Sequence, residues 1–299
     1  MTNQVKADLM LLLVTLLWGF SYWLMDISLA EIGTFNLNAM RFIIAFLFAV
    51  IFSYKKMMNL NKATIRYAAL LGFILMIAYI GATYGVKYTS ISNAGFLIAL
   101  AVVITPVLGF FFKGQKPGKK LIIVVFIALV GIALLTLNEE LRPAAGDLLC
   151  ILSAFGSAVH LLVVETAVRK EEVDAFQLGI LQLGFTGLYM LTMCFIVETP
   201  HFPYTQRVWV SVLVLAVFCT GLSFIVQTVA QQYTSASHVG VIYSLEPVFA
   251  GFVAFFLAGE VLSVREYCGA ALLMSGIFIM EIDLQKFIRL FRKKITSNQ

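Results

Sequence analysis

The sequence contains one long apolar segment twice, and this repeat limits the folds open to the chain more than any other feature. Tyr233–Glu260 and Tyr88–Gln115 agree at 10 of 28 positions when they are aligned without a gap at an offset of 145 residues. Duplication on this scale is typical of membrane proteins built from internal repeats. Pro106 lies four residues beyond the position that matches Pro247. The sequence therefore predicts two halves that are related without being equivalent, with each copy forming one long apolar helix.

The composition indicates which solvent these segments need. Hydrophobic residues make up 61% of the chain and charged residues 12%, whereas soluble domains average about half and about a quarter. Ten stretches approach the roughly 20 apolar residues that a membrane-spanning helix requires. They are 8–29, 36–54, 65–86, 91–112, 120–137, 145–167, 176–197, 208–230, 236–258 and 265–284. The first stretch is too long for the core of a signal peptide, so it counts as a membrane-spanning helix like the others. We therefore expect an all-α integral membrane protein with ten transmembrane helices.

Basic residues are distributed unevenly over the connections between these stretches. If the N-terminus lies in the cytoplasm, five of the 21 basic residues fall on the outer side, which leaves sixteen inside. Positive residues collect on the cytoplasmic side of membrane proteins. We therefore expect a multi-pass protein of the cytoplasmic membrane with both termini cytoplasmic, and with Glu139 and Thr199 near the opposite face. This asymmetry also accounts for the net charge of +5 without a nucleic-acid partner.

The number of helices in each half predicts how the halves are related. Each half is expected to contain five helices, an odd number, so the second half must enter the membrane from the opposite face. We expect two inverted five-helix repeats over residues 1–140 and 141–299, the second ending in a short basic cytoplasmic tail. Inverted repeats are a common construction of secondary transporters, which bind their substrates near the middle of the membrane.

Several short motifs resemble the EamA-type family of the drug/metabolite transporter superfamily. They are Leu17-Trp18-Gly19, Arg41-Phe42, Asn93-Ala94-Gly95-Phe96-Leu97, Thr105-Pro106, and Ser244-Leu245-Glu246-Pro247-Val248-Phe249-Ala250 with Gly259-Glu260. The resemblance covers nearly the whole chain and implies ten helices in two inverted repeats that carry small organic solutes, often amino acids or related metabolites. The chain departs from the family pattern at Ser157, where a tryptophan is often found, and at Gln115, where Glu260 would predict a carboxylate.

Glu246 is the residue that we expect to couple transport to protons or to orient a cationic group. It lies about 15 Å along its helix from Ala236, at 1.5 Å per residue, close to the middle of a hydrocarbon core about 30 Å thick. A carboxylate at that depth costs on the order of 3 kcal/mol unless it faces the protein interior or water. Pro247 cannot donate to the carbonyl of Tyr243, so an acceptor is freed beside the acid. We expect helix breaks at Pro106 and Pro247; the alternative role for Glu246 is a hydrogen-bonded contact that locks two helices together.

Two other polar residues at helix interiors have open interpretations. His160 lies near the middle of its helix and is either a proton partner or a hydrogen-bonded packing residue. Arg41 either binds a substrate carboxylate or extends its charged end to the membrane interface. His238 lies nearer to the cytoplasmic end of its helix, where we expect a packing role, and Lys87 and Glu165 lie near helix ends, where an interfacial role is expected.

Aromatic and amide side chains are the expected walls of a substrate pocket. The candidates are Trp18, Ser21, Tyr22, Tyr79, Thr83, Tyr84, Gln182, Gln227 and Tyr243. We expect the aromatic members of this set to share one cavity at the interface of the two repeats, which would suit a small, partly apolar solute. The alternative is that these side chains pack in the core or face lipid.

These patterns favour a secondary transporter that works by alternating access, and the family resemblance implies export of small organic metabolites, with proton coupling expected at Glu246. The alternatives are an uptake permease or drug exporter of the same fold, a channel, and an intramembrane enzyme. The sequence contains no phosphate-binding loop for ATP and no HExxH-type metal motif, and Gly221-Leu222-Ser223-Phe224 lacks the second glycine of a nucleophile turn. The four cysteines lie apart in apolar stretches and are expected to pack as free thiols. We therefore expect no metal or cofactor, and we expect the small-molecule substrate and the lipid bilayer as partners.

Overall fold

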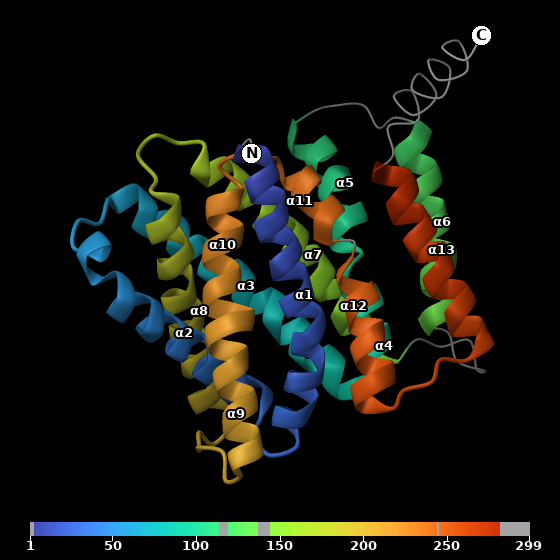
Figure 1. Cartoon of the computed structure of the whole chain (residues 1–299), viewed down its shortest axis with the longest axis horizontal. Coiled ribbons are helices and arrows are strands. Elements are labelled where there is room, and N and C mark those ends of the chain that lie inside the picture. The colour runs from blue at the N-terminus through green and yellow to red at the C-terminus, as the bar shows by residue number, and fades with distance from the viewer. Residues whose placement is uncertain (1–2, 114–118, 137–143, 244, 282–299) are drawn as a thin grey trace.

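The computed structural model describes residues 3–113, 119–136, 144–243 and 245–281, and within these ranges the chain forms helices and no strands (Figure 1). The helices are α1 (Asn3–Leu29), α2 (Thr34–Met57), α3 (Lys62–Tyr88), α4 (Ile91–Ile98), α5 (Ala101–Lys113), α6 (Lys119–Thr136), α7 (Ala145–Val168), α8 (Ala175–Val197), α9 (Gln206–Val214), the π-helix η1 (Leu215–Leu222), α10 (Ser223–Ala230), α11 (Ala236–Tyr243), α12 (Glu246–Val253), the π-helix η2 (Ala254–Ala258) and α13 (Val264–Glu281). Seven described stretches are long and apolar enough to cross a membrane. The all-α class is confirmed, and a total of ten crossings stays a prediction. Glu139 and the basic tail after residue 281 lie outside the described residues.

The large apolar side chains divide between a packed interior and an exposed outer surface. Phe42 and Leu71 are fully buried, whereas Phe52 is 74% exposed and Phe195 is 68% exposed. Soluble monomers rarely expose large contiguous apolar areas. An exterior of this kind is suited to contact with lipid, in agreement with a multi-pass membrane protein.

α3 packs against both α7 and α8. Glycines permit this close approach. A Cβ atom at Gly81 would lie 2.6 Å from the carbonyl oxygen of Leu149 in α7, and one at Gly72 would lie 2.7 Å from Cβ of Phe185 in α8. α6 and α13 pack against each other at one side of the molecule (Figure 1). Small residues at helix crossings are a usual means of bringing membrane helices together.

Two of the expected membrane helices, over 91–112 and 236–258, are broken in the middle, and the break in the second lies next to Pro247, where it was expected. α4 ends at Ile98 and α5 begins at Ala101, while α11 ends at Tyr243 and α12 begins at Glu246. Both pairs of boundaries are 145 residues apart, which is the offset of the sequence repeat. In Figure 1, the chain passes from α4 to α5 toward the end of the molecule at which α1 begins, and from α11 to α12 away from it. The two broken stretches therefore run in opposite directions.

Proline explains only one of these breaks. Pro247 lies in the first turn of α12, where its missing N–H costs nothing to that helix but prevents continuation from α11. Pro106, in contrast, lies inside α5, so the break that we expected at Pro106 is found instead at Ala99–Leu100, where the sequence has no proline.

Three glutamates cap helices to which they do not belong. Glu198 accepts from the first backbone N–H groups of α2, Glu260 from those of α4, and Glu31 from the two residues that precede α9. The N···O distances lie between 2.8 and 3.2 Å. The first N–H groups of a helix have no partner within the helix and carry partial positive charge, which a carboxylate stabilises. All three helices begin at the end of the molecule at which α1 ends (Figure 1).

The cap at Glu31 predicts a pH-dependent contribution to stability. Hydrogen bonds from the Thr205 hydroxyl and from the backbone N–H groups of Tyr204 and Thr205 lower the pKa of Glu31 below its usual 4.5. A carboxyl whose folded pKa is lowered stabilises the folded state above its ordinary pKa, and that contribution is lost as the pH falls through the lowered value. We expect wild type to unfold at a higher temperature than Glu31→Gln at pH 7, with the difference shrinking as the pH falls below 4.5 and vanishing below the lowered pKa of Glu31. A difference that persists unchanged in acid would contradict this assignment.

Candidate functional site

A cavity lies among α1, α3, α7, α10 and the two broken stretches. It leaves about 80 Å³ for the centres of water-sized molecules. Since one water needs about 10–15 Å³ by this measure, there is room for about five waters or for a small organic group. The walls are mainly apolar and aromatic, with a few polar side chains among them, which is the usual character of a small-molecule site.

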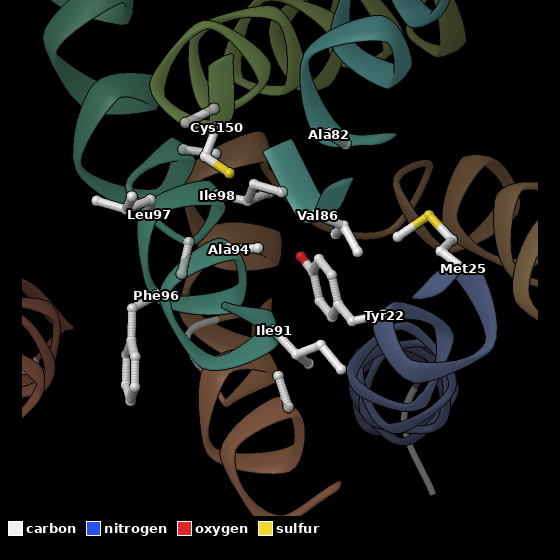
Figure 2. Packing of buried hydrophobic residues seen from close by; sticks show 14 of the residues in the cluster. Tyr22, Met25, Ala82, Val86, Ile91, Ala94, Phe96, Leu97, Ile98 and Cys150 are labelled. Carbon is white, nitrogen blue, oxygen red and sulfur yellow. The ribbon is translucent and has the colours of Figure 1, made fainter. Parts of the chain in front are cut away.

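Glu246 lines this cavity at the first turn of α12, directly after the break in the helix. The Tyr22 hydroxyl donates a hydrogen bond to Oε1 of Glu246, with an O···O distance of 2.5 Å. Both residues are buried, with exposures of 3% and 7%. Figure 2 shows the Tyr22 ring reaching from α1 toward α4, with Ile91 and Ala94 beside it. The carboxyl group therefore lies between α1 and α12. One of its oxygens accepts the hydrogen bond from Tyr22, and the residue borders the cavity.

Aromatic rings form one side of the cavity. The Trp18 ring packs against Tyr243 and Phe224, with centroid distances of 4.8 and 5.3 Å. The indole N–H of Trp18 donates to the backbone carbonyl of Cys219 at 2.9 Å. Cys219 belongs to the π-helix η1, a form of helix that is often found at functional sites. These contacts fix the position of Trp18 between α1 and the stretch that contains α10.

Two chains of hydrogen bonds run from the cavity wall into the bundle. In one, Nε2 of His160 contacts Oε1 of Gln182 at 2.9 Å, and Nε2 of Gln182 donates to Thr228 at 3.0 Å. In the other, Nε2 of Gln227 donates to Oε1 of Gln231 at 3.1 Å. His160 and Gln227 line the cavity, and the other three residues lie behind them. All five side chains are at most 2% exposed, so these bonds are shielded from the solvent outside the protein.

Arg41 lies behind the cavity wall and is fully buried. Its guanidinium carbon is 4.9 Å from the centre of the Tyr79 ring, its Nε donates to the Thr220 hydroxyl at 2.9 Å, and one Nη lies 3.3 Å from Sδ of Met25. The other Nη has no hydrogen-bond partner, and no acidic residue pairs with Arg41 among the residues that the structure describes. Because the charge is inside the bundle, the alternative that Arg41 extends to the membrane interface is wrong.

The residues that we expected in one pocket fall into two groups. Those that line the cavity are Trp18, Ser21, Tyr22, Tyr79, His160, Gln227, Tyr243 and Glu246, and those that do not are Arg41, Thr83, Tyr84 and Gln182. Tyr84 stacks on Tyr88 instead, because five residues turn a helix by about 140° and direct it away from the face of Tyr79. Thr83 accepts a hydrogen bond from Asn38 of α2 at 2.9 Å.

Other lining residues were not predicted as part of a pocket by sequence reasoning. Ser153 and Ser157 lie on the same face of α7 as His160, and their spacing of four and three residues was a signal that could have identified them. Ala101 lies at the position of the first half that matches Glu246, and it also lines the cavity. The site is therefore asymmetric: the second half contributes a carboxyl group where the first contributes a methyl group.

The residues near helix ends make local contacts. Nε2 of His238 lies 3.0 Å from Oδ1 of Asp8, which joins α11 to the first turns of α1. Glu165 pairs with Arg169 across one helical turn at 2.5 Å. Cys150, Cys194 and Cys219 are buried free thiols, and Cys268 is an exposed one. Among the described residues, His, Cys, Asp and Glu side chains form no cluster of three or more that could hold a metal ion.

Comparison with known proteins identifies a family for this arrangement. The model of the EamA-like transporter family matches residues 5–137 and 144–282, which is most of the chain in two successive segments.

Individual proteins show the same relationship. An uncharacterized transporter of Archaeoglobus fulgidus is 28% identical over 94% of this chain and 87% of its own length. The uncharacterized transporter YoaV of Bacillus subtilis is 22% identical over 92% of this chain and 97% of its own. A protein of known crystal structure shares the fold with a TM-score of 0.66, at 17% identity over 92% of this chain and 96% of the other.

Proposed function

The chain belongs to the EamA-like transporter family and is a membrane transporter, and from this premise we propose that it is a secondary transporter that exports small organic metabolites by alternating access. Amino acids or related compounds are the proposed substrates, and protons are the proposed coupling ion. The observation that carries the proposal is the position of Glu246, a buried carboxyl group that faces an aromatic cavity at a broken helix.

The geometry of a broken helix supports binding at this point. A break frees backbone donors and acceptors, and a membrane protein tolerates such a break where it is buried or lines a cavity. The cavity lies at both breaks, since it is lined by Ala99 and Ala101 from one and by Tyr243 and Glu246 from the other. A substrate bound there would contact parts of both halves and could respond to movement of either.

We further propose that residues 1–140 and 141–299 are two inverted five-helix repeats. The coincidence of helix boundaries at an offset of 145 residues and the opposite directions of the broken stretches support this arrangement. So does the match of the family model to the chain in two successive segments. Rocking of one such repeat against the other around a fixed site is a usual means of alternating access.

Arg41 and Glu246 together suggest a substrate with both charges. Glu246 faces the cavity, and Arg41 lies behind Tyr79 and Met25, which line it. A modest movement of these two side chains would bring a substrate carboxylate to the unpartnered Nη of Arg41. This pairing is consistent with an amino acid as the substrate, because a guanidinium forms strong hydrogen bonds with carboxylates.

The proposed function is tested by reconstituting the purified protein in vesicles and measuring solute movement with and without an imposed proton gradient. We expect a panel of amino acids and related metabolites to include solutes that the protein exchanges across the membrane, and that accumulate when a pH gradient is imposed. Passive equilibration alone would indicate a channel, and a chemically altered product would indicate an enzyme. Absence of exchange for the whole panel would contradict the proposed substrate class.

Orientation is proposed from charge, with both termini cytoplasmic. The starts of α2, α4 and α9 lie at the end of the molecule remote from the start of α1 (Figure 1), which is the end that the distribution of basic residues predicts to be outside. We expect an impermeant thiol reagent applied from outside to label a single cysteine at 139 or 199 and to leave one within 57–62 unlabelled. The background should carry Cys268→Ser, since Cys268 is the exposed native thiol. Labelling at 57–62 with silence at 139 would reverse the topology.

A further inference from the structure

The hydrogen-bond chain that begins at Gln227 has a direction that the backbone fixes. Nε2 of Gln231 donates to the carbonyl oxygen of Leu161 at 3.2 Å. A carbonyl oxygen only accepts, so the amide oxygen of Gln231 must point the other way and accept from Nε2 of Gln227. Oε1 of Gln227 is then left as an acceptor. It is buried and has no partner in the part of the chain that the structure describes, and Gln227 lines the cavity.

The second chain fixes the tautomer of His160 in the same way. Oγ1 of Thr228 lies 2.7 Å from the carbonyl oxygen of Phe224, and two oxygens at that distance require the hydroxyl hydrogen between them. Thr228 therefore accepts from Nε2 of Gln182, and Oε1 of Gln182 accepts from Nε2–H of His160. A neutral imidazole with its hydrogen on Nε2 has an acceptor at Nδ1.

These directions place three acceptors among the residues of the cavity wall, beside the hydroxyl of Tyr243, which is also buried without a partner among the described residues and can donate or accept. Oε1 of Gln227, Nδ1 of His160 and the carboxyl group of Glu246 all belong to residues that line the cavity. Of the three, Glu246 has a hydrogen-bond donor from the protein, the Tyr22 hydroxyl on one of its two oxygens. A ligand group that offers only acceptors would leave these buried atoms unpaired, which costs more than an ordinary hydrogen bond gains.

We propose that Gln227 and His160 are specificity residues that select a ligand group with several N–H donors, namely a primary ammonium. This inference rests on the proposed function and names the chemical group that the same cavity takes. An ammonium offers three donors in different directions, and the aromatic wall formed by Trp18 and Tyr243 favours a cation over a neutral group. The same two residues would reject an acceptor-only group of equal size.

Binding of two small aromatic probes to the purified protein tests this proposal. Benzylamine carries the ammonium, and acetophenone is a neutral aromatic ketone of similar size with only an acceptor. We expect benzylamine to bind at least about tenfold more tightly than acetophenone, and we expect Gln227→Leu to remove that preference. Gln177→Leu is the matched control, because Gln177 is a buried glutamine that bonds the carbonyls of Lys56 and Asn59 away from the cavity. Equal binding of the two probes to wild type, or equal weakening by both substitutions, would overturn the proposal.

A second measurement does not depend on the stability of a glutamine variant. The chain has three histidines, so ¹⁵N-labelled imidazole in a His201→Gln, His238→Gln background reports His160 alone. We expect the Nε2–H tautomer and a shift of the Nδ1 resonance on addition of benzylamine. The Nδ1–H tautomer, or no shift at saturating benzylamine, would overturn the proposal. Because neither experiment measures transport, failure of the vesicle assay would leave this result standing and would count against the proposed function alone.

Discussion

Substitution of Glu246 by glutamine is expected to abolish the accumulation of substrate that a pH gradient drives, while exchange of substrate across the membrane continues. Glutamine keeps the volume of the side chain and can still accept from the Tyr22 hydroxyl, which donates to Glu246 at 2.5 Å. It cannot bind and release a proton. A carboxyl group in this apolar wall is costly as a permanently unpaired charge, so gaining and losing a proton with substrate movement is the chemistry that its position favours. Vesicle assays of exchange and of pH-driven accumulation measure the two properties separately.

The same variant distinguishes two roles for the carboxyl group. If Glu246 holds a cationic group of the substrate directly, Glu246→Gln should weaken binding itself, and exchange should fall together with accumulation. Tyr22→Phe is the matched variant, because it removes one donor from Glu246 and leaves the carboxyl group in place. We expect it to retain pH-driven accumulation at a reduced rate. A folded Glu246→Gln protein with full activity from about pH 5.5 to about pH 8 would exclude both roles and leave a packing role for Glu246.

The composition and the lengths of the apolar stretches predicted the class of fold, and positions within those stretches predicted much of the cavity wall. Trp18, Tyr22, Tyr79 and Tyr243 line the cavity as expected from their positions within apolar helices. Tyr84 does not, because a position within a helix gives depth but gives the direction of a side chain only relative to its neighbours. Depth could therefore be counted from the sequence, whereas the face that each helix turns toward the cavity depends on tertiary packing.

The breaks in the two repeated helices show where reasoning from single residues is insufficient. Proline predicts the break before Pro247, but the matching break at Ala99–Leu100 has no proline and no glycine at its centre. The repeat itself contained the information: a break at one copy predicts a break 145 residues away in the other. The direction of the two hydrogen-bond chains could not be predicted, because it depends on the carbonyls of Leu161 and Phe224, which the fold brings to Gln231 and Thr228.

Gly81→Ala is expected to destabilise the contact between α3 and α7. The added Cβ would lie 2.6 Å from the carbonyl oxygen of Leu149 and 3.0 Å from the backbone nitrogen of Ser153. Both are backbone atoms that cannot rotate away, so the helices must separate. Overpacking of this kind costs about 1–3 kcal/mol, which exceeds the roughly 1 kcal/mol that alanine gains over glycine within a helix.

The separation of α3 from α7 would also displace cavity residues, since Tyr79 and Ala82 lie on α3 and Ser157 and His160 on α7. We therefore expect Gly81→Ala to lower both the unfolding temperature in detergent and the affinity for benzylamine. Gly251→Ala is the matched control, because a Cβ at Gly251 in α12 would meet nothing within 4 Å, and there the helix preference for alanine acts alone. Thermal unfolding of the two variants beside wild type measures the difference. If Gly81→Ala unfolds at or above the temperature of Gly251→Ala, the close crossing of α3 and α7 is not the contact that holds the cavity in shape.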